Sequence, residues 1–274
     1  MNEKIRSTVG ATALSLGLVA LMLLLMLTAL NNVGTDGELY YRLQTEAGVL
    51  PSAGVSDADL RAIDGELAKY LAGQPNELVL PLDNAPGEYT VYTAVVNGEL
   101  TPVFNEKEMA HLQDCRHLFD LLRKVRRRLI PWVVLLVVGG AYLLQNRRTA
   151  RKAALLSPLI LLVPLGAFAL WAVIDFDGAF TFFHRVLFSN DLWLLDPRTD
   201  LLIRICPESM FMTMGSMIAL RGLAILIGVP AVAVGLTLVW PKSKQKEENT
   251  WNANRTTRRG AAYRPKTFDV KGKR

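Results

Sequence analysis

The sequence predicts an α-helical integral membrane protein with four transmembrane helices and a small mixed α/β exoplasmic domain between the first and second helices. Hydrophobic residues make up 51% of the 274 residues although 20% are charged, so the two kinds must be segregated. Four stretches contain no Asp, Glu, Lys or Arg: Ser7–Leu30, Leu129–Asn146, Ala153–Ile174 and Gly222–Trp240. Because about 20 helical residues cross a hydrocarbon core of about 30 Å, each stretch is long enough to span it.

The basic residues predict that both termini lie in the cytoplasm. Eleven Lys and Arg against three acids follow Trp240, and residues 147–152 hold four bases and no acid. Residues 31–122 carry 15 acids and five bases, which suits a translocated domain. Short basic segments stay inside, so these charges outweigh the opposing run Arg123–Arg128 on the outer side.

The apolar stretch of the first segment is too long for a typical signal peptide, which favours an uncleaved anchor. The predicted organisation is a cytoplasmic N-terminus (1–6), the first helix (7–30), the exoplasmic domain (31–128), the second helix (129–146), a cytoplasmic loop (147–152), the third helix (153–174), an aromatic outer or interfacial loop (175–210), the fourth helix with the segment leading into it (211–240), and a disordered basic cytoplasmic tail (241–274).

The exoplasmic domain should contain helices and a hairpin. Ser56 is a suitable N-cap for a helix that runs through Tyr70. The stretches 89–96 and 99–104 flank Asn97-Gly98, which is typical of a two-residue hairpin turn. Asn105 should cap a further helix. Pro131 would break that helix if it continued into the second span, so we expect the chain to bend between Leu122 and Pro131.

The segment 175–210 is rich in aromatic residues, so it should lie at the membrane interface or pack on the helix bundle. It also holds one of only three histidines, His111, His117 and His184, all of them on the predicted outer side. A lone histidine is most often structural. Two beside the bilayer strengthen the case for acid–base chemistry, although composition alone still favours the structural interpretation. No motif for a protein nucleophile is present. With two cysteines and no Cys/His spacing typical of a metal site, we expect neither a metal nor a cofactor.

Two motifs resemble the signatures of a bacterial four-span integral membrane family that includes the lipoprotein intramolecular transacylase. The first motif runs from Glu108 through His111 to Asp114, and the second from Phe183 to Ile203. The resemblance extends over about residues 8–240 and implies that His111 and His184 are the catalytic pair. The chain departs from the family pattern at Cys115 and Cys206, where valine and phenylalanine are usual. The motifs also place supporting polar and aromatic residues near the pair: Asp114, Asn190, Asp191, Trp193, Asp196 and Asp200.

The resemblance implies an enzyme that moves the sn-2 acyl chain of a diacylglyceryl-cysteine lipoprotein to the α-amine of the same cysteine. We assign His184 as the base and His111 as the group that orients substrate or donates a proton, with Asp114 fixing the His111 tautomer; the two histidine roles are interchangeable at this stage. The expected partners are membrane lipid and the diacylated lipoprotein N-terminus, with no nucleic acid, and the expected state is a monomer. Two alternatives remain: a non-enzymatic envelope binding or scaffold protein with structural histidines, and another lipid-linked acyl or phospho-transferase.

The cysteines allow a further hypothesis. Cys115 lies one helical turn after His111, and Cys206 follows the second motif. Both fall on the predicted outer side, where a disulfide can form. A Cys115–Cys206 bridge would tie the two motifs together, and the alternative is two unpaired thiols.

Overall fold

The computed structural model describes residues 2–75, 79–81, 89–91, 93–96, 99–144 and 146–239. In chain order the elements are α1 (Glu3–Val33), α2 (Gly37–Glu46), α3 (Leu50–Ala53), α4 (Asp57–Ala72), β1 (Val79–Pro81), β2 (Tyr89–Val91), β3 (Thr93–Val96), β4 (Glu99–Pro102), α5 (Glu106–Leu143), α6 (Arg147–Leu156), α7 (Leu159–Ile174), α8 (Phe176–Leu187), α9 (Leu201–Ile205) and α10 (Glu208–Val239). The predicted tail, 241–274, lies outside the described residues.

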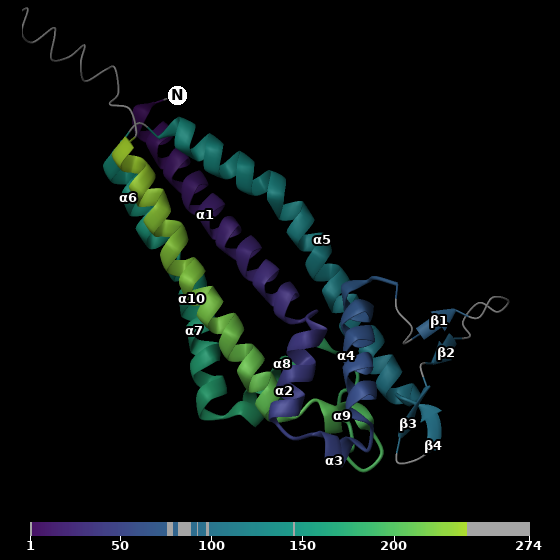
Figure 1. The fold of residues 1–274 in the computed structure, drawn as a ribbon. Coiled ribbons are helices and arrows are strands. Elements are labelled where there is room, and N and C mark those ends of the chain that lie inside the picture. The colour runs from purple at the N-terminus through teal and green to yellow at the C-terminus, as the bar shows by residue number, and fades with distance from the viewer. Residues whose placement is uncertain are drawn as a thin grey trace, which may run out of the picture.

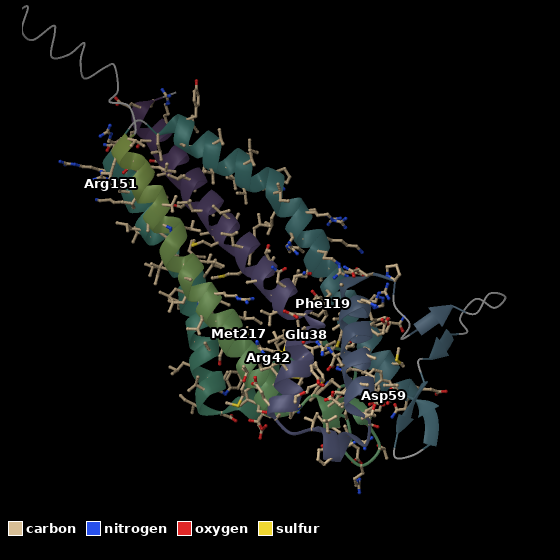
Figure 2. All side chains as sticks on the ribbon, viewed as in Figure 1. Glu38, Arg42, Asp59, Phe119, Arg151 and Met217 are labelled. Atoms are coloured by element: carbon tan, nitrogen blue, oxygen red, sulfur yellow. The ribbon has the colours of Figure 1, made fainter. Side chains whose placement is uncertain are left out.

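The long helices α1, α5, α6–α7 and α10 lie side by side in one bundle (Figure 1). Figure 2 shows Arg151 at one end of it and Glu38, Arg42 and Asp59 near the other. Among the described residues, three helical stretches are long and apolar enough to cross a membrane: α1, Arg147–Ile174 and α10. The remaining predicted span, 129–146, coincides with the end of α5, where Arg126, Arg127 and Arg128 shorten the apolar part.

Helix α7 exposes an apolar surface on the outside of the bundle. No residue of α7 is buried within the chain, although the helix is strongly apolar. Val163 and Val173 are 67% and 81% exposed. A continuous apolar surface of this kind is stable against lipid and unfavourable in water.

Helices α1 and α5 pack closely because glycines line their contact. A Cβ atom at Gly17 would lie 2.8 Å from the backbone nitrogen of Val137, and one at Gly140 would lie 2.5 Å from that of Leu14. Such short distances exclude any larger residue without a backbone shift. Small residues allow this close approach between membrane helices. The pairs also show that the two helices run antiparallel.

Helix α5 continues through Pro131, so the predicted break between Leu122 and Pro131 is wrong. The helix curves along its length instead (Figure 1). Proline removes one backbone hydrogen bond, and neighbouring helices in a bundle tolerate that loss. The boundary expected at residue 128 is therefore not a boundary of secondary structure.

The two predicted loops that flank α7 also contain helices. Residues 147–152 lie within α6, which Asn146 caps by accepting a hydrogen bond from the backbone of Arg148. The aromatic segment 175–210 contains α8 and α9. Asp175 accepts a hydrogen bond from the backbone of Gly178, and Asp177 lies in the first turn of α8, so this start is well capped. The aromatic content of the segment predicted only an interfacial loop, because the cap at Asp175 is a signal from one residue.

At one end of the bundle, α2, α4, α9, the first turns of α5 and the start of α10 share a hydrophobic core. Ser56 caps α4 as predicted, by accepting a hydrogen bond from the backbone of Asp59. Strands β3 and β4 pair antiparallel with Val96 opposite Glu99, which agrees with the predicted hairpin, although Asn97 and Gly98 lie outside the described residues. The expected strand 89–96 is divided into β2 and β3, and β2 pairs with β1.

Candidate active site

The N-terminus of α5 is fixed by a network that reaches the second motif. Asn105 and Glu108 form a capping box, in which each side chain accepts a hydrogen bond from the other's backbone. Glu108 Oε1 also accepts a bond from the backbone nitrogen of Leu202 at 2.6 Å, and Asn105 Nδ2 donates to Asp200 Oδ1 at 2.9 Å. These bonds hold the first turns of α5 against α9.

This arrangement brings His111 on α5 next to His184 on α8. Their ring centroids lie 6.3 Å apart, and each side chain is 8% exposed. Phe188 lies against both rings, with centroids 5.1 Å from His111 and 5.6 Å from His184. Trp193 lies 5.0 Å from His184. The two histidines therefore share an aromatic enclosure, which lowers the local dielectric constant.

The tautomer of His184 follows from its hydrogen bond. Its Nδ1 lies 2.8 Å from the carbonyl oxygen of Phe180, one turn earlier on α8. A carbonyl only accepts, so Nδ1 carries the proton, and Nε2 has the lone pair when the ring is neutral. Burial lowers the pKa of His184, while the Phe180 bond acts in the opposite direction.

The pKa of His111 is also lowered, so this ring is neutral near pH 7. Burial is the main cause that lowers its pKa to about 4; the neighbouring His184 adds to the shift and Asp114 opposes it. Nε2 of His111 lies 3.6 Å from the Cys115 sulfur. Nδ1 is buried and, within the described part of the chain, has no hydrogen-bond partner. A buried polar atom of this kind costs free energy unless a ligand satisfies it.

Asp114 does not bond to His111, so its predicted role as the tautomer-fixing group is wrong. It accepts a hydrogen bond from Asn190 Nδ2 at 2.8 Å instead. Asp114 faces the second motif rather than the ring on the preceding turn. The Asn190–Asp114 bond therefore joins the two motifs.

The remaining supporting residues divide into structural and peripheral ones. Asp200 is 3% exposed and accepts bonds from Asn105, from Thr199 and from the backbone of Asp196. The Asp196 side chain pairs with Arg198, which lowers the pKa of this exposed carboxyl to about 2. Asp191 is exposed, and no bond of its side chain is found among the described residues. The structure places neither Asp191 nor Asp196 against a histidine ring.

The proposed disulfide is absent, and Cys115 and Cys206 are both free thiols. Burial raises the pKa of Cys115 to about 12 and raises that of Cys206 further. Both thiols therefore stay protonated, which excludes them as thiolate nucleophiles near neutral pH. Within the described ranges, no cluster of three or more His, Cys, Asp or Glu side chains is arranged to hold a metal ion.

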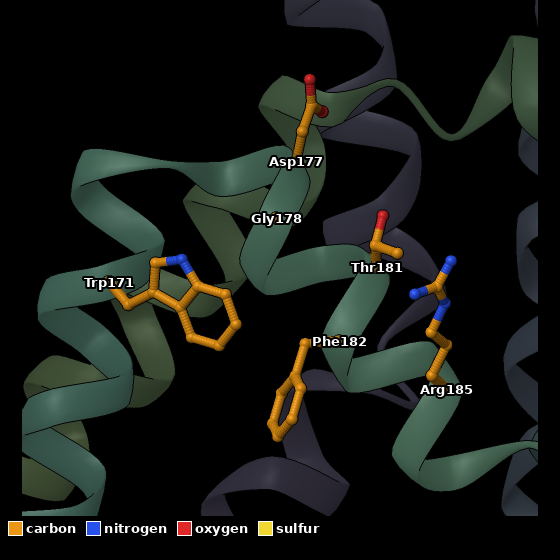
Figure 3. A pocket seen from close by; sticks show the side chains of 6 residues that line it. All are labelled: Trp171, Asp177, Gly178, Thr181, Phe182 and Arg185. Atoms are coloured by element: carbon orange, nitrogen blue, oxygen red, sulfur yellow. The ribbon is translucent and has the colours of Figure 1, made fainter.

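A pocket of about 460 Å³ lies on another side of α8 (Figure 3). Trp171 and Phe182 form its aromatic wall, with ring centroids 5.2 Å apart. Thr181, Asp177 and Arg185 provide its polar edge. The pocket thus combines apolar and charged groups next to the histidine helix, and neither catalytic-pair candidate lines it.

Three features of the site were missed by sequence reasoning. These are the Phe180 carbonyl, the contact of Cys115 with His111, and the hydrogen bond that the backbone of Leu202 donates to Glu108. A backbone acceptor leaves no signal in side-chain identity. The spacing of Cys115 and His111 did carry a signal in the sequence, because residues four apart share a helical face.

The fold and the site define a multi-pass helical membrane protein with a buried histidine pair at one end of its bundle. The model of the family named lipoprotein intramolecular transacylase Lit matches residues 15–211, and the chain belongs to this family. Family membership assigns it to the membrane transferases that act on lipoproteins. No curated protein matches the chain.

Three solved structures of the membrane integral lipoprotein intramolecular transacylase Lit from Bacillus cereus have a similar fold. One is 19% identical with a TM-score of 0.51 and covers 90% of this chain and 98% of its own. The other two carry a histidine substitution. They are 20% and 21% identical, with TM-scores of 0.51 and 0.52, and cover 90% and 89% of this chain and 94% and 96% of their own.

Proposed function

We propose that this protein moves the sn-2 acyl chain of a diacylglyceryl-cysteine lipoprotein onto the α-amine of the same cysteine by histidine acid–base catalysis. The observation that carries the proposal is the buried pair of His111 and His184, each with one ring nitrogen that makes no hydrogen bond to the described part of the chain. Family membership supports the reaction class.

The reaction needs a base because the amine is protonated at rest. An α-ammonium group has a pKa of about 7.7–8.0 and must lose a proton before it attacks the ester carbonyl. The ammonium first loses one proton to solvent. As the neutral amine attacks and the new C–N bond forms, Nε2 of His184 takes a second proton from that nitrogen. The bond from the carbonyl carbon to the glyceryl oxygen then breaks, and His184 passes its proton to that oxygen. The product carries an N-acyl group and a free glyceryl hydroxyl, and one proton has gone to solvent, so atoms and charge balance.

His111 serves as a hydrogen-bond donor in this scheme. The Cys115 thiol keeps its proton and donates to Nε2 of His111, which favours the tautomer with the proton on Nδ1. The buried Nδ1–H then points to a substrate oxygen, either the ester oxyanion or the leaving glyceryl oxygen. Substrate binding satisfies the donor that lacks a protein partner.

The substrate itself supplies both nucleophile and ester, which agrees with the high thiol pKa values of Cys115 and Cys206. Because both groups belong to one molecule, proximity contributes several kcal/mol to the acceleration. Asn190 and Asp114 act as positioning residues, since their bond holds the two motifs together.

We further propose that the chain crosses the membrane four times with both termini in the cytoplasm and the histidines on the outer side. The end of α5 provides the additional crossing: it packs along α1 on one side and exposes apolar side chains such as Val134, Leu135 and Val138 on the other. The charge distribution supports this orientation, because basic segments are retained in the cytoplasm. The protein works as a monomer on membrane lipid and lipoprotein N-termini, with no nucleic acid involved.

The proposal is tested in a bacterial host whose lipoproteins retain the diacyl form. N-terminal mass spectrometry should detect the lyso form after expression of the wild-type chain. The lyso form should be absent after expression of His184→Ala or His111→Ala. It should be present after expression of His117→Ala, because His117 is exposed. Diacyl lipoproteins that persist beside correctly inserted wild-type protein would contradict the proposal. Full activity of His184→Ala would favour a binding or scaffold protein with a structural histidine.

A further inference from the structure

A second pocket, distinct from the histidine site, lies between α1, the end of α4 and the middle of α5. Its volume is about 470 Å³. Four basic side chains line it, Arg123, Lys124, Arg126 and Arg127, and its apolar lining includes Leu24 and Ile130. These bases form the run that opposes the charge rule of the predicted topology, and the transfer reaction gives them no role.

Only one of these bases is paired within the described part of the chain. Arg123 donates to Asp120 at 2.7 Å and to the carbonyl of Leu71 at 2.8 Å. Lys124, Arg126 and Arg127 have no ion pair or hydrogen-bond partner there. The Nε atom of Arg126 is buried and unsatisfied. An enclosed guanidinium donor without an acceptor is costly, so the pocket is suited to an anion.

The pocket also lies where the surface of α5 changes character. Beyond it, exposed side chains are apolar from Ile130 to Val138, including Trp132, which is 58% exposed. Aromatic residues of this kind are enriched at the level of lipid headgroups. Leu24 places the pocket close to the end of the roughly 20 residues of α1, counted from Ser7, that a hydrocarbon core holds. The charged part of the pocket therefore lies at phosphate level and its apolar lining at acyl-chain level.

One glycine makes room for Arg123 at the edge of the pocket. A Cβ atom on Gly73 would lie 3.0 Å from Nη2 of Arg123. Gly73 also has a φ of +71°, a conformation that favours glycine. The Schellman-type end of α4 thus leaves room for the Arg123 guanidinium at the edge of the pocket.

We propose that this pocket binds the phosphate of an anionic glycerophospholipid, with one acyl chain lying along Leu24 and Ile130. Arg126 and Arg127 hold the phosphate oxygens, and Lys124 adds positive charge at the rim. A free phosphate ion would satisfy the bases but leave the apolar lining exposed, so the lipid fits the whole pocket. The site is independent of the transfer reaction and remains if the proposed function is wrong.

The test is native mass spectrometry of the full chain in detergent, titrated with phosphatidylglycerol or phosphatidylcholine. Wild type should bind one phosphatidylglycerol about tenfold or more tightly than phosphatidylcholine, as charge-assisted hydrogen bonds predict. R126Q/R127Q should lose this preference and R126K/R127K should keep part of it. The matched control R148Q/K152Q, which changes two bases on α6, should bind like wild type.

Three results would overturn the proposal. The first is equal binding of the two lipids by the wild type. The second is an equal loss in the pocket variant and in the α6 control, which would indicate general charge attraction. The third is full displacement of phosphatidylglycerol by inorganic phosphate at equal concentration, which would indicate a free-phosphate site. Unchanged melting temperatures of the variants confirm that each is folded.

Discussion

The imidazole rings of His111 and His184 lie 6.3 Å apart in a buried site, although they belong to different helices and different motifs. Nδ1 of His184 is held by the Phe180 carbonyl, and Nε2 of His111 lies against the Cys115 thiol. Each ring therefore has a defined orientation and one nitrogen left for substrate. The proposed division into base and donor follows from these two contacts.

The contact of Cys115 with His111 predicts a modest kinetic effect. Cys115→Val removes the donor to Nε2 and should lower kcat/KM about fivefold, since a hydrogen bond contributes about 1 kcal/mol. Cys115→Ser keeps a donor and should retain most activity. Nitrogen NMR shifts of His111 report the tautomer, which should change in Cys115→Val alone. An unchanged NMR signal and rate in that variant would show that the thiol has no positioning role.

The lowered histidine pKa values predict the pH dependence of the reaction. Because burial lowers the pKa of both rings, that of His111 to about 4, the substrate amine is the group that titrates near neutrality. The logarithm of kcat/KM should rise with a slope of one up to the amine pKa, about 7.7–8.0, and then level off. A slope approaching two between pH 5.5 and 6.5 would mean that a histidine titrates at its ordinary value.

Glu108 is predicted to stabilise the site rather than to react. It is 1% exposed and accepts bonds from the backbones of Asn105 and Leu202. Glu108→Ala leaves both donors unsatisfied and should cost about 2–5 kcal/mol of folding free energy, seen as a lower melting temperature in detergent. The exposed Glu106 in the same turn is the control, and Glu106→Ala should cost less than about 1 kcal/mol. Equal losses of folding free energy in the two variants would contradict the stabilising role of the Glu108 hydrogen bonds.

The buried pair of Gln44 and Asp64 predicts that stability depends on pH. Gln44 Nε2 donates to Asp64 Oδ1, while Asp64 Oδ2 and Gln44 Oε1 are buried acceptors with no partner within the described ranges. A proton on Asp64 Oδ2 supplies a donor for Gln44 Oε1. Burial is the main cause that raises the pKa of Asp64 to about 7, against the opposing Gln44 bond.

Because the folded state holds this proton more tightly than the unfolded state, its stabilising effect is complete below about pH 4 and is lost as the pH rises through 7. The loss between pH 5 and pH 8 should be about 3 kcal/mol in unfolding experiments. Asp64→Asn, which cannot ionise, should remove this dependence. A wild-type protein that becomes more stable over that range would contradict the assignment.

Local signals predicted much of this fold. The caps at Ser56 and Asn105 and the pairing of β3 with β4 depend on neighbouring residues, and the structure has all three. The break at Pro131 was wrong because packing within the bundle compensates for a missing hydrogen bond in α5. Helix α8 was missed because its aromatic content outweighed the cap at Asp175 in the interpretation.

The sequence predicted which residues belong to the site better than it predicted which of them are in contact. The resemblance named both histidines, but the Asn190–Asp114 bond depends on how the chain after α8 packs against α5. The Phe180 carbonyl is a backbone acceptor within α8, and side-chain identity gives no signal for it. Asp191 and Asp196 were grouped with the site because they are close in sequence, whereas the structure directs them to the surface. Sequence proximity within a motif does not distinguish a residue that lines the site from one that shapes the backbone.

The most direct measurement uses purified protein and a mixture of two synthetic diacylglyceryl-cysteine peptides, one with an isotope-labelled sn-2 chain and the other with a different peptide sequence and no label. Mass spectrometry of the products should find the label on the α-amine of its own peptide only, with the rate reduced about 10²–10⁴-fold in His184→Ala and unchanged in His117→Ala. Label on the second peptide, or transfer at the wild-type rate by His184→Ala, would contradict intramolecular transfer by the histidine pair.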